Sequence, residues 1–167
     1  MSKPTTARFI AFIAAMSALS NVLGVLALPI GAMTLHLIQL PMVFSGLAAG
    51  PLAGGLVGLF GAFVMAFTLP RPNPYIILGN AILGFLTGSF YMRLKNVTRK
   101  PILPQMLSVL LACAVQMPYV YLTDVYLMGM PYAVVIGIIG VLFVEDLLSG
   151  FISHIVLYRL DVKAILA

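Results

Sequence analysis

The chain has 167 residues, of which 62% are hydrophobic and 8% are charged, and its formal net charge is +5. Soluble domains have about a quarter of their residues charged, so this composition excludes an ordinary soluble protein. A membrane protein of this length has room for about six crossings of about 20 residues each. We therefore expect a single membrane-embedded domain over 1–167. We attribute the positive charge to cytoplasmic loops and expect no nucleic acid as a partner.

The first predicted helix covers 8–28 and carries a face of small side chains. At 100° per residue its alanines fall within about 100° of one another; they are Ala7, Ala11, Ala14, Ala15 and Ala18. Such a face either packs inside the bundle or offers a flat, exposed surface to a partner helix. Pro29 and Gly31 end this helix, and 30–36 is expected to be a loop or connector.

The uncharged stretch 37–69 predicts a membrane helical hairpin. A short apolar run of roughly 14 residues and a longer run at 52–69 are separated by Gly50-Pro51. Pro removes a backbone donor and Gly allows a positive φ, so a tight turn is expected there. The short first helix either spans the membrane or is re-entrant. Three glycines of the second run form a stripe that another helix can approach closely, namely Gly54, Gly58 and Gly61.

Three more helices follow, separated by breaks that are clear in the sequence. The breaks are the proline-rich turn 70–74, the polar loop 93–100 and the turn at Met130-Pro131. The helices are expected over 75–92, 103–128 (with a kink at Pro118) and 132–160.

Lys and Arg residues predict the orientation of this bundle. Eight of them fall on one side if the N-terminus is inside, and only Arg71 falls on the other. The eight are Lys3, Arg8, Arg93, Lys95, Arg99, Lys100, Arg159 and Lys163. An even number of crossings is then required. The predicted fold class is an all-α membrane protein, a bundle of six transmembrane helices with both termini cytoplasmic.

Motifs for catalysis, nucleotide binding and metal binding are not found in the sequence. It has no Gly-x-Ser-x-Gly, His-Glu-x-x-His or Gly-x-x-x-x-Gly-Lys pattern. His36 and His154 are expected near opposite membrane faces, and Cys113 is the only cysteine. We therefore expect no catalytic residues, no metal and no cofactor. If the chain is part of an active transporter, another chain must hydrolyse ATP.

Polar residues of several predicted helices gather in the outer half of the bundle. Polar groups inside a membrane need a cavity or a partner. One interpretation is a pocket for a small, polar, partly aromatic ligand, and the other is hydrogen bonding between helices. Because the residues share one depth, we favour the pocket, with these lining residues: Gln39, Asn80, Gln116, Tyr119, Asp124 and Tyr75. Asp124 would favour a cationic or amine-bearing ligand.

A second polar group lies on the last predicted helix. Glu145 and Asp146 fall near its middle, and Ser149, Ser153 and His154 share the same half of the helix. This face either lines a cavity or a subunit contact, or it holds the bundle together through hydrogen bonds. The sequence does not separate the two acids.

Several features together resemble the substrate-binding S component of energy-coupling factor (ECF) transporters. They are the small size, the six crossings, the pairs Ala11/Ala15 and Ala14/Ala18, and the block LHLIQLPMVFSGLAAGPLAGGLVGLFGAF. Many relatives have His-x-Pro where this chain has Gln39-Leu40-Pro41. The relatives and this chain both have a Gly-Pro-x-x-Gly element after this position, and in this chain it runs from Gly50 to Gly54.

The resemblance implies a function in uptake. It implies a multi-pass protein of a prokaryotic plasma membrane that binds a vitamin-like micronutrient from outside. Its implied partners are a transmembrane coupling subunit and two ATPase subunits. The alanines Ala11, Ala14, Ala15 and Ala18 would form the docking surface. Two other classes stay open: a subunit of another membrane complex or channel, and a small membrane enzyme that uses Glu145, Asp146 and His154.

Overall fold

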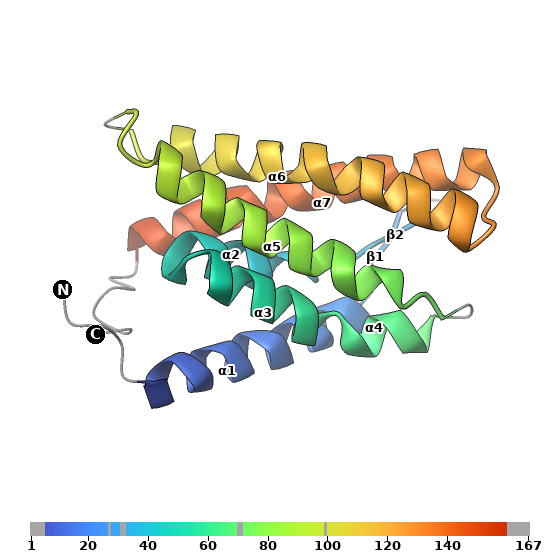
Figure 1. Cartoon of the computed structure of the whole chain (residues 1–167), viewed down its shortest axis with the longest axis horizontal. Helices are drawn as coiled ribbons and strands as arrows, with labels where there is room; N and C mark the ends of the chain where they lie inside the picture. Colours follow the sequence, from blue (N-terminus) through green and yellow to red (C-terminus); the bar gives the residue numbers. More distant parts are fainter. Residues whose placement is uncertain (1–5, 27, 31–32, 70–71, 99, 160–167) are drawn as a thin grey trace.

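The computed structural model describes residues 6–26, 28–30, 33–69, 72–98 and 100–159. Most of them are helical, and the helices run lengthwise through an elongated bundle (Figure 1). The helices are α1 (Thr6–Val25), α2 (Gln39–Ala49), α3 (Pro51–Gly61), α4 (Phe63–Thr68), α5 (Tyr75–Leu94), α6 (Ile102–Leu122) and α7 (Tyr132–Arg159). The predicted helices are found close to their predicted bounds, except that the one at 52–69 is divided in two. Four of the basic residues that predict the orientation lie outside the described residues, namely Lys3, Arg71, Arg99 and Lys163.

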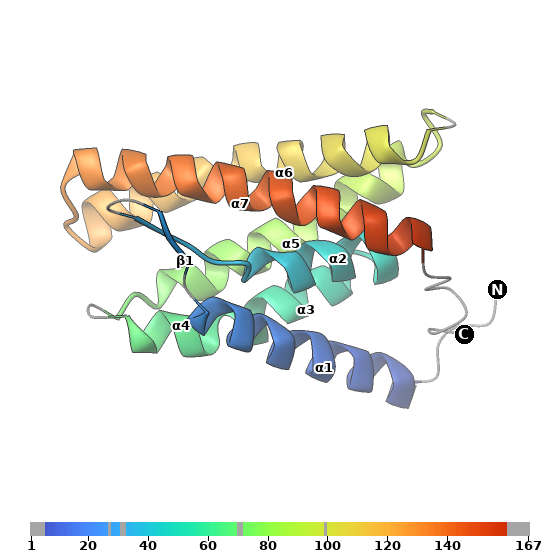
Figure 2. The same ribbon diagram turned by 180° about the vertical axis from the view of Figure 1, so that it is seen from behind.

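The connector after α1 is not a plain loop. Two short strands, β1 (Leu28–Ile30) and β2 (Met33–Leu35), pair antiparallel, with Leu28 opposite Leu35 and Pro29 opposite Thr34. The prediction of an all-α chain is therefore wrong at this point. Pro29 is compatible with a two-stranded hairpin because every strand in it is an edge strand. The hairpin lies at one end of the bundle and contacts α7 (Figure 2).

The predicted helix at 52–69 is divided into α3 and α4 by a break at Ala62. Asn21 of α1 causes this break by inserting its side chain between two backbone groups. Its Nδ2 donates to the carbonyl oxygen of Phe60 at 2.9 Å, and its Oδ1 accepts from the N–H of Val64 at 2.8 Å. In an unbroken helix Val64 would donate directly to Phe60. A side chain that enters the ladder in this way is a known cause of a helix kink.

The last turn of the predicted helix at 103–128 is also irregular. After α6, residues Thr123–Leu127 form one turn of π-helix, in which the N–H of Met128 donates to the carbonyl oxygen of Thr123 at 2.9 Å. Pro118 lies within α6, where its ring removes one backbone donor. The wider π turn allows Thr123 and Asp124, which are neighbours in sequence, both to be buried.

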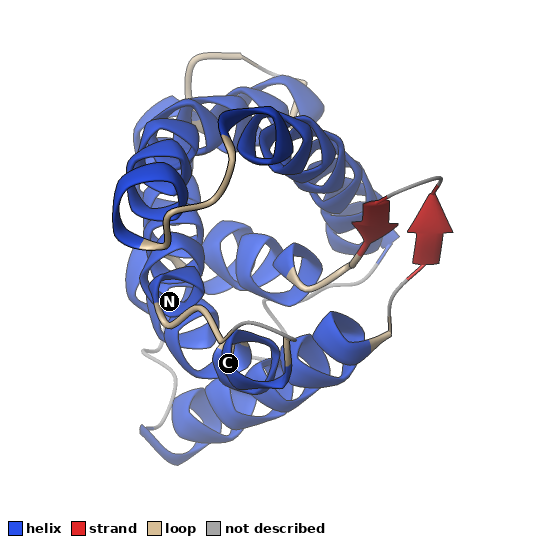
Figure 3. Ribbon diagram, turned by 90° about the vertical axis from the view of Figure 1, so that its right-hand side faces the viewer, coloured by secondary structure: helices blue, strands red, loops and turns tan. Residues whose placement is uncertain are grey.

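Five segments of the described residues are long and apolar enough to cross a membrane: α1, α3 with α4, α5, α6 with its π turn, and α7. In contrast, α2 has 11 residues, or about 16 Å of helix. The hydrocarbon layer is about 30 Å thick, so α2 is too short to cross it. The helix lies inside the ring formed by the other helices (Figure 3), and Met42 and Val43 are fully buried. The number of crossings and the side of the termini stay predictions.

Close contacts between glycines hold α2, α3 and α5 together. A Cβ atom on Gly46 would lie 2.7 Å from the carbonyl oxygen of Gly84, and a Cβ atom on Gly54 would clash with the same group. The predicted close approach to the glycine stripe is therefore confirmed, with α5 as the neighbour of Gly54 and Gly58 and with α1 as the neighbour of Gly61. Gly50 ends α2 with a φ of 94°, a conformation that favours glycine.

The bundle has two different ends. The start of α1, the turn between α5 and α6 and the end of α7 lie at one end, and the hairpin lies at the other (Figures 1 and 2). Of the basic residues that the structure describes, Arg8 lies in the first turn of α1, Arg93 in the last turn of α5 and Arg159 in the last turn of α7. We call the first end the basic end and the second the hairpin end.

Candidate functional site

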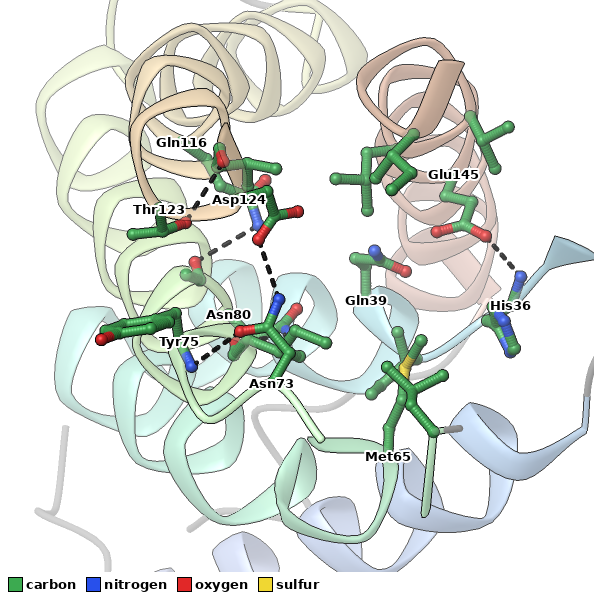
Figure 4. A pocket seen from close by; sticks show the side chains of 18 of the residues that line it. His36, Gln39, Met65, Asn73, Tyr75, Asn80, Gln116, Thr123, Asp124 and Glu145 are labelled. Atoms are coloured by element: carbon green, nitrogen blue, oxygen red, sulfur yellow. Dashed lines mark hydrogen bonds between the residues drawn. The ribbon is translucent and has the colours of Figure 1, made fainter. Parts of the chain in front are cut away.

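A cavity of ≈ 370 Å³ opens in the half of the bundle near the hairpin end. This volume is in the range of pockets that bind small molecules. The walls come from β2, α2, α4, α5, α6, the π turn and α7. All six residues that the sequence selected line this cavity: Gln39, Tyr75, Asn80, Gln116, Tyr119 and Asp124. Figure 4 shows Gln39, Asn80, Gln116 and Asp124 around this cavity. That they bind a ligand stays a prediction.

Asp124 is held by a side chain from the turn between α4 and α5. Nδ2 of Asn73 donates to Oδ1 of Asp124 at 2.8 Å. Oδ1 of Asn73 in turn accepts from the N–H of Tyr75 at 3.1 Å, where α5 begins. Both groups of the Asn73 amide are therefore used, and the carboxyl group of Asp124 is fixed at the wall of the cavity (Figure 4). Asn73 stands beside Tyr75 in the turn before α5, and an Asn next to a helix start is a common signal for such a turn.

Two tyrosines join α5 to α6 beside this group. The hydroxyl of Tyr119 donates to the carbonyl oxygen of Tyr75 at 3.0 Å. This carbonyl lies in the first turn of α5, so the bond connects the two helices at the hairpin end. Hydrogen bonding between helices, which the sequence left as an alternative to a pocket, is therefore present within the cavity wall itself.

Two amides on α5 and α6 are only half paired. Nδ2 of Asn80 donates to the carbonyl oxygen of Ile76 at 3.0 Å, and Nε2 of Gln116 donates to that of Gly79 at 3.3 Å. Among the residues that the structure describes, the amide oxygens of both side chains have no hydrogen-bond partner. Buried polar atoms are usually paired, so unpaired ones in a cavity wall are candidates for ligand contacts.

Glu145 and Asp146, which the sequence did not separate, have different surroundings. Glu145 lines the cavity and accepts a hydrogen bond from the backbone N–H of His36, at the end of the hairpin. The amide of Gln39 lies beside the same carboxyl group. Asp146 is not part of the cavity wall and lies beside the thiol of Cys113 on α6. Glu145 therefore belongs to the site, and it joins α7 to the hairpin.

His36 lies at the edge of the cavity, outside the membrane-spanning helices. Its Nε2 is 3.1 Å from the hydroxyl of Thr34. Partial burial lowers the pKa of the imidazole below its ordinary value, because burial disfavours the charged form. Thr34 and His36 enter the site through the strand β2. Both lie in the segment 30–36, which was expected to be a loop or connector and not part of the pocket.

An apolar wall completes the cavity. The first half of α7 supplies most of it, and α4, α5 and α6 add side chains next to the polar groups. The apolar residues are Val134, Ile138, Val141 and Leu142 of α7, with Met65, Ile76 and Val120 from the other helices. The cavity is therefore polar on the side of α5 and α6 and apolar along much of α7.

The remaining polar residues of α7 do not reach the cavity. Ser149 and Ser153 are fully buried nearer the basic end, and His154 lies 2.6 Å from Oε1 of Gln105 through its Nδ1. Gln105 is in the first turn of α6. The contact between His154 and Gln105 joins α6 to α7, as the alternative interpretation of this face expected. The hydroxyl groups of Ser149 and Ser153 have no hydrogen-bond partner among the described residues.

The alanine face of α1 is exposed. Ala11, Ala14, Ala15 and Ala18 all have exposed side chains, whereas Ile13 and Ser17 point into the bundle. Packing inside this chain therefore does not account for the alanines. Their role as a docking surface stays a prediction.

Comparisons with known proteins give one consistent result. A family model described as "ECF transporter, substrate-specific component" matches residues 8–160. A solved structure described as "Structure and mechanism of the S component of a bacterial ECF transporter" is similar with a TM-score of 0.71 and 22% sequence identity. The similarity covers 93% of this chain and 95% of that one. At this identity the likeness shows the fold alone. The comparison with curated protein sequences gave no significant match.

Proposed function

Because the chain belongs to the family of substrate-specific components of ECF transporters, we propose that it binds a vitamin-like micronutrient in the cavity and delivers it inward across the plasma membrane of a prokaryote. Its partners in this proposal are a transmembrane coupling subunit and two ATPase subunits, which hydrolyse ATP for it. The chain itself acts as a binding subunit, a single membrane-embedded domain without a catalytic residue.

The cavity is the observation that carries this proposal. It lies in the half of the bundle away from the basic end, and it gathers polar side chains from α2, α5 and α6 around a volume that fits a small molecule. Basic residues favour the cytoplasmic side, so the cavity is expected to face the outside. A site that takes a scarce nutrient from outside needs this placement.

The exposed alanines of α1 support the second part of the proposal. Side chains without bulk allow a helix of the coupling subunit to approach closely and to gain dispersion contacts over several turns. The large apolar side chains that lie elsewhere on the exposed surface, such as Phe85 and Phe143, would keep a partner helix further away and instead suit lipid.

Replacement of Ala15 or Ala14 by Trp tests this function. Added bulk on an exposed face meets lipid in the isolated protein, so we expect expression and ligand binding to be nearly unchanged. Uptake by cells that supply the complete transporter should fall at least tenfold, because the coupling subunit can no longer approach. Uptake of the labelled ligand and binding to the purified variant are measured side by side.

Ala114→Trp is the matched control for these variants. Ala114 is also exposed, but on α6, so the same substitution should leave uptake unchanged. Normal uptake by Ala15→Trp would contradict docking through α1. Loss of folding in Ala15→Trp would instead assign the alanines to packing.

A further inference from the structure

Three buried amide side chains in the cavity wall have an oxygen atom without a partner. They belong to Gln39, Asn80 and Gln116, whose exposed fractions are 1%, 5% and 3%. The residues come from α2, α5 and α6, and all line the cavity. A buried acceptor without a donor is costly, so three of them around one space indicate a ligand that supplies the donors.

In two of these three amides, the hydrogen bonds of the NH₂ group identify the oxygen as the atom without a partner. The NH₂ groups of Asn80 and Gln116 both face backbone carbonyl oxygens, those of Ile76 and Gly79. A carbonyl can only accept a hydrogen bond, so the NH₂ group must lie on that side. The amide oxygen therefore remains for a donor that the described part of the chain does not provide.

Two carboxyl groups add to this excess of acceptors. Asp124 lies on the π turn after α6 and Glu145 lies on α7, on opposite sides of the cavity, with Gln39 between them in Figure 4. Asp124 accepts a hydrogen bond from Asn73, and Glu145 accepts one from the backbone N–H of His36 and has the amide of Gln39 beside it. Their orientation is thus set before a ligand enters, which lowers the cost of binding.

Charge in the cavity has one sign. Among the residues that the structure describes, no Lys or Arg lines it. A buried carboxyl group keeps its negative charge at a lower cost when a positive partner lies beside it, since the free energy of removing a charge from water is large. A cation bound between Asp124 and Glu145 would supply this partner.

We propose that the cavity selects a protonated amine or amidine carried on an apolar or aromatic body. A protonated amine has three N–H groups and an amidinium has four, so they pair with part of the acceptor set formed by Asp124, Glu145 and the unpaired amide oxygens. The body of the molecule packs against Val134, Ile138 and the other apolar residues of α7. The proposal rests on the proposed function, because it names the class of molecule that the same cavity binds.

Three probes of nearly the same shape test this selectivity: benzamidine, which is a cation with N–H donors, benzamide, which is neutral, and benzoate, which is an anion. Their affinities for the full chain in lipid nanodiscs are measured by ligand-detected NMR. We expect benzamidine to bind at least tenfold more tightly than benzamide, and benzoate not to bind.

Isosteric variants connect the selectivity to the two acids. Asp124→Asn and Glu145→Gln keep an acceptor for Asn73 and for His36 but remove the charge. Each should weaken benzamidine binding roughly tenfold to a hundredfold, the range for a lost hydrogen bond to a charged group. Asp146→Asn, a buried acid on the same helix outside the cavity, is the control and should leave benzamidine binding unchanged. Size-exclusion profiles confirm that all variants are folded.

Arg71 needs its own variant, because it lies outside the described residues and between Leu69 and Asn73, which both line the cavity. Arg71→Gln should leave the preference for benzamidine unchanged.

Several outcomes would overturn the inference. They are benzamide or benzoate bound as tightly as benzamidine, benzoate binding that is lost in Arg71→Gln, a preference that survives both acid variants, and no binding of any probe. Failure of the proposed function would be seen in a different measurement, as normal uptake by the Ala15→Trp cells, which does not depend on the charge of a probe.

Discussion

The two halves of this bundle differ in how their backbones meet. Toward the basic end, α2, α3 and α5 touch directly through glycines, so that a methyl group on Gly46 or Gly54 would have no room. Toward the hairpin end the backbone is irregular. There α1 is followed by strands, α3 is interrupted at Ala62, and α6 ends in a π turn.

The difference shows how a small bundle makes a cavity. Regular helices packed through glycine leave no space for a ligand. Where the helices bend or change pitch, space opens, and side chains must replace the lost backbone contacts. Asn21 and Asn73 do this, the first at the break between α3 and α4 and the second beside Asp124. The half near the basic end thus gives rigidity, and the half near the hairpin gives the site.

The two ends are expected to differ most in their accessibility from outside the cell, because we predict that they lie on opposite sides of the membrane. In a Cys113→Ala background, Tyr132→Cys probes the hairpin end and Asn96→Cys probes the basic end, which holds the turn between α5 and α6. A membrane-impermeant maleimide added to intact cells should label the first fully and the second not at all, because the basic residues favour the cytoplasm. Labelling of the Asn96→Cys variant from outside would contradict the prediction that the basic end faces the cytoplasm.

The glycine contacts between α2, α3 and α5 are expected to contribute strongly to the free energy of unfolding. Gly54→Ala places a methyl group against the backbone of Gly84, so we expect a loss of about 3 kcal/mol from overpacking. Gly140→Ala on α7 is the control, since nothing lies within 4 Å of its added Cβ atom. Thermal unfolding can be followed with a thiol-reactive dye, because Cys113 is the only cysteine and is buried. If Gly54→Ala and Gly140→Ala had the same stability, the contact between Gly54 and Gly84 would not be a main contribution to the free energy of unfolding.

Polar residues of the cavity should affect binding more than stability. Gln116→Ala removes an acceptor from the cavity, and we expect benzamidine binding to weaken about tenfold. Gln105→Ala is the matched control, because it is a buried glutamine on the same helix that contacts His154 and not the cavity. A similar loss of binding in both variants would indicate a general disturbance of α6 and not the loss of an acceptor in the cavity.

The smallest expected effect is a dependence of stability on pH at the edge of the cavity. Burial lowers the pKa of His36 in the folded protein, so the unfolded chain binds a proton more readily. Stability from the neutral imidazole is complete above the ordinary pKa of about 6.5 and is lost as the pH falls from there toward the lower pKa of the folded state. His36→Gln should remove this part of the pH dependence. Unfolding curves between about pH 5 and 8 measure it, and identical curves for both proteins would exclude His36 as the cause.

Much of the fold could be predicted from the sequence because it depends on local signals. Apolar runs, prolines and Gly50 fixed the helices to within a few residues. The hairpin was missed since each strand has three residues, too few for a pattern of alternation. The break at Ala62 was missed since its cause, Asn21, lies on another helix.

The candidate site was easier to predict than the shape of its walls. Polar residues in apolar helices are rare enough to be selected one by one, and all six chosen in this way line the cavity. The distinction between Glu145 and Asp146 could not be made, because it depends on which neighbouring helix each acid faces. His36 could not be included, because only the hairpin brings it to α7.

The bridge made by Asn21 also limits how this sequence can diverge. The side chain must accept from Val64 and donate to Phe60 with one planar group. An ionised Asp could accept but not donate, and Leu could do neither. Asn21 and the break at Ala62 are therefore expected to be inherited as one unit. Loss of the amide would leave the N–H of Val64 and the carbonyl oxygen of Phe60 unpaired, unless α3 and α4 joined into one continuous helix in which Val64 donates to Phe60. Such a helix would change the path of the segment that carries Met65 to the cavity.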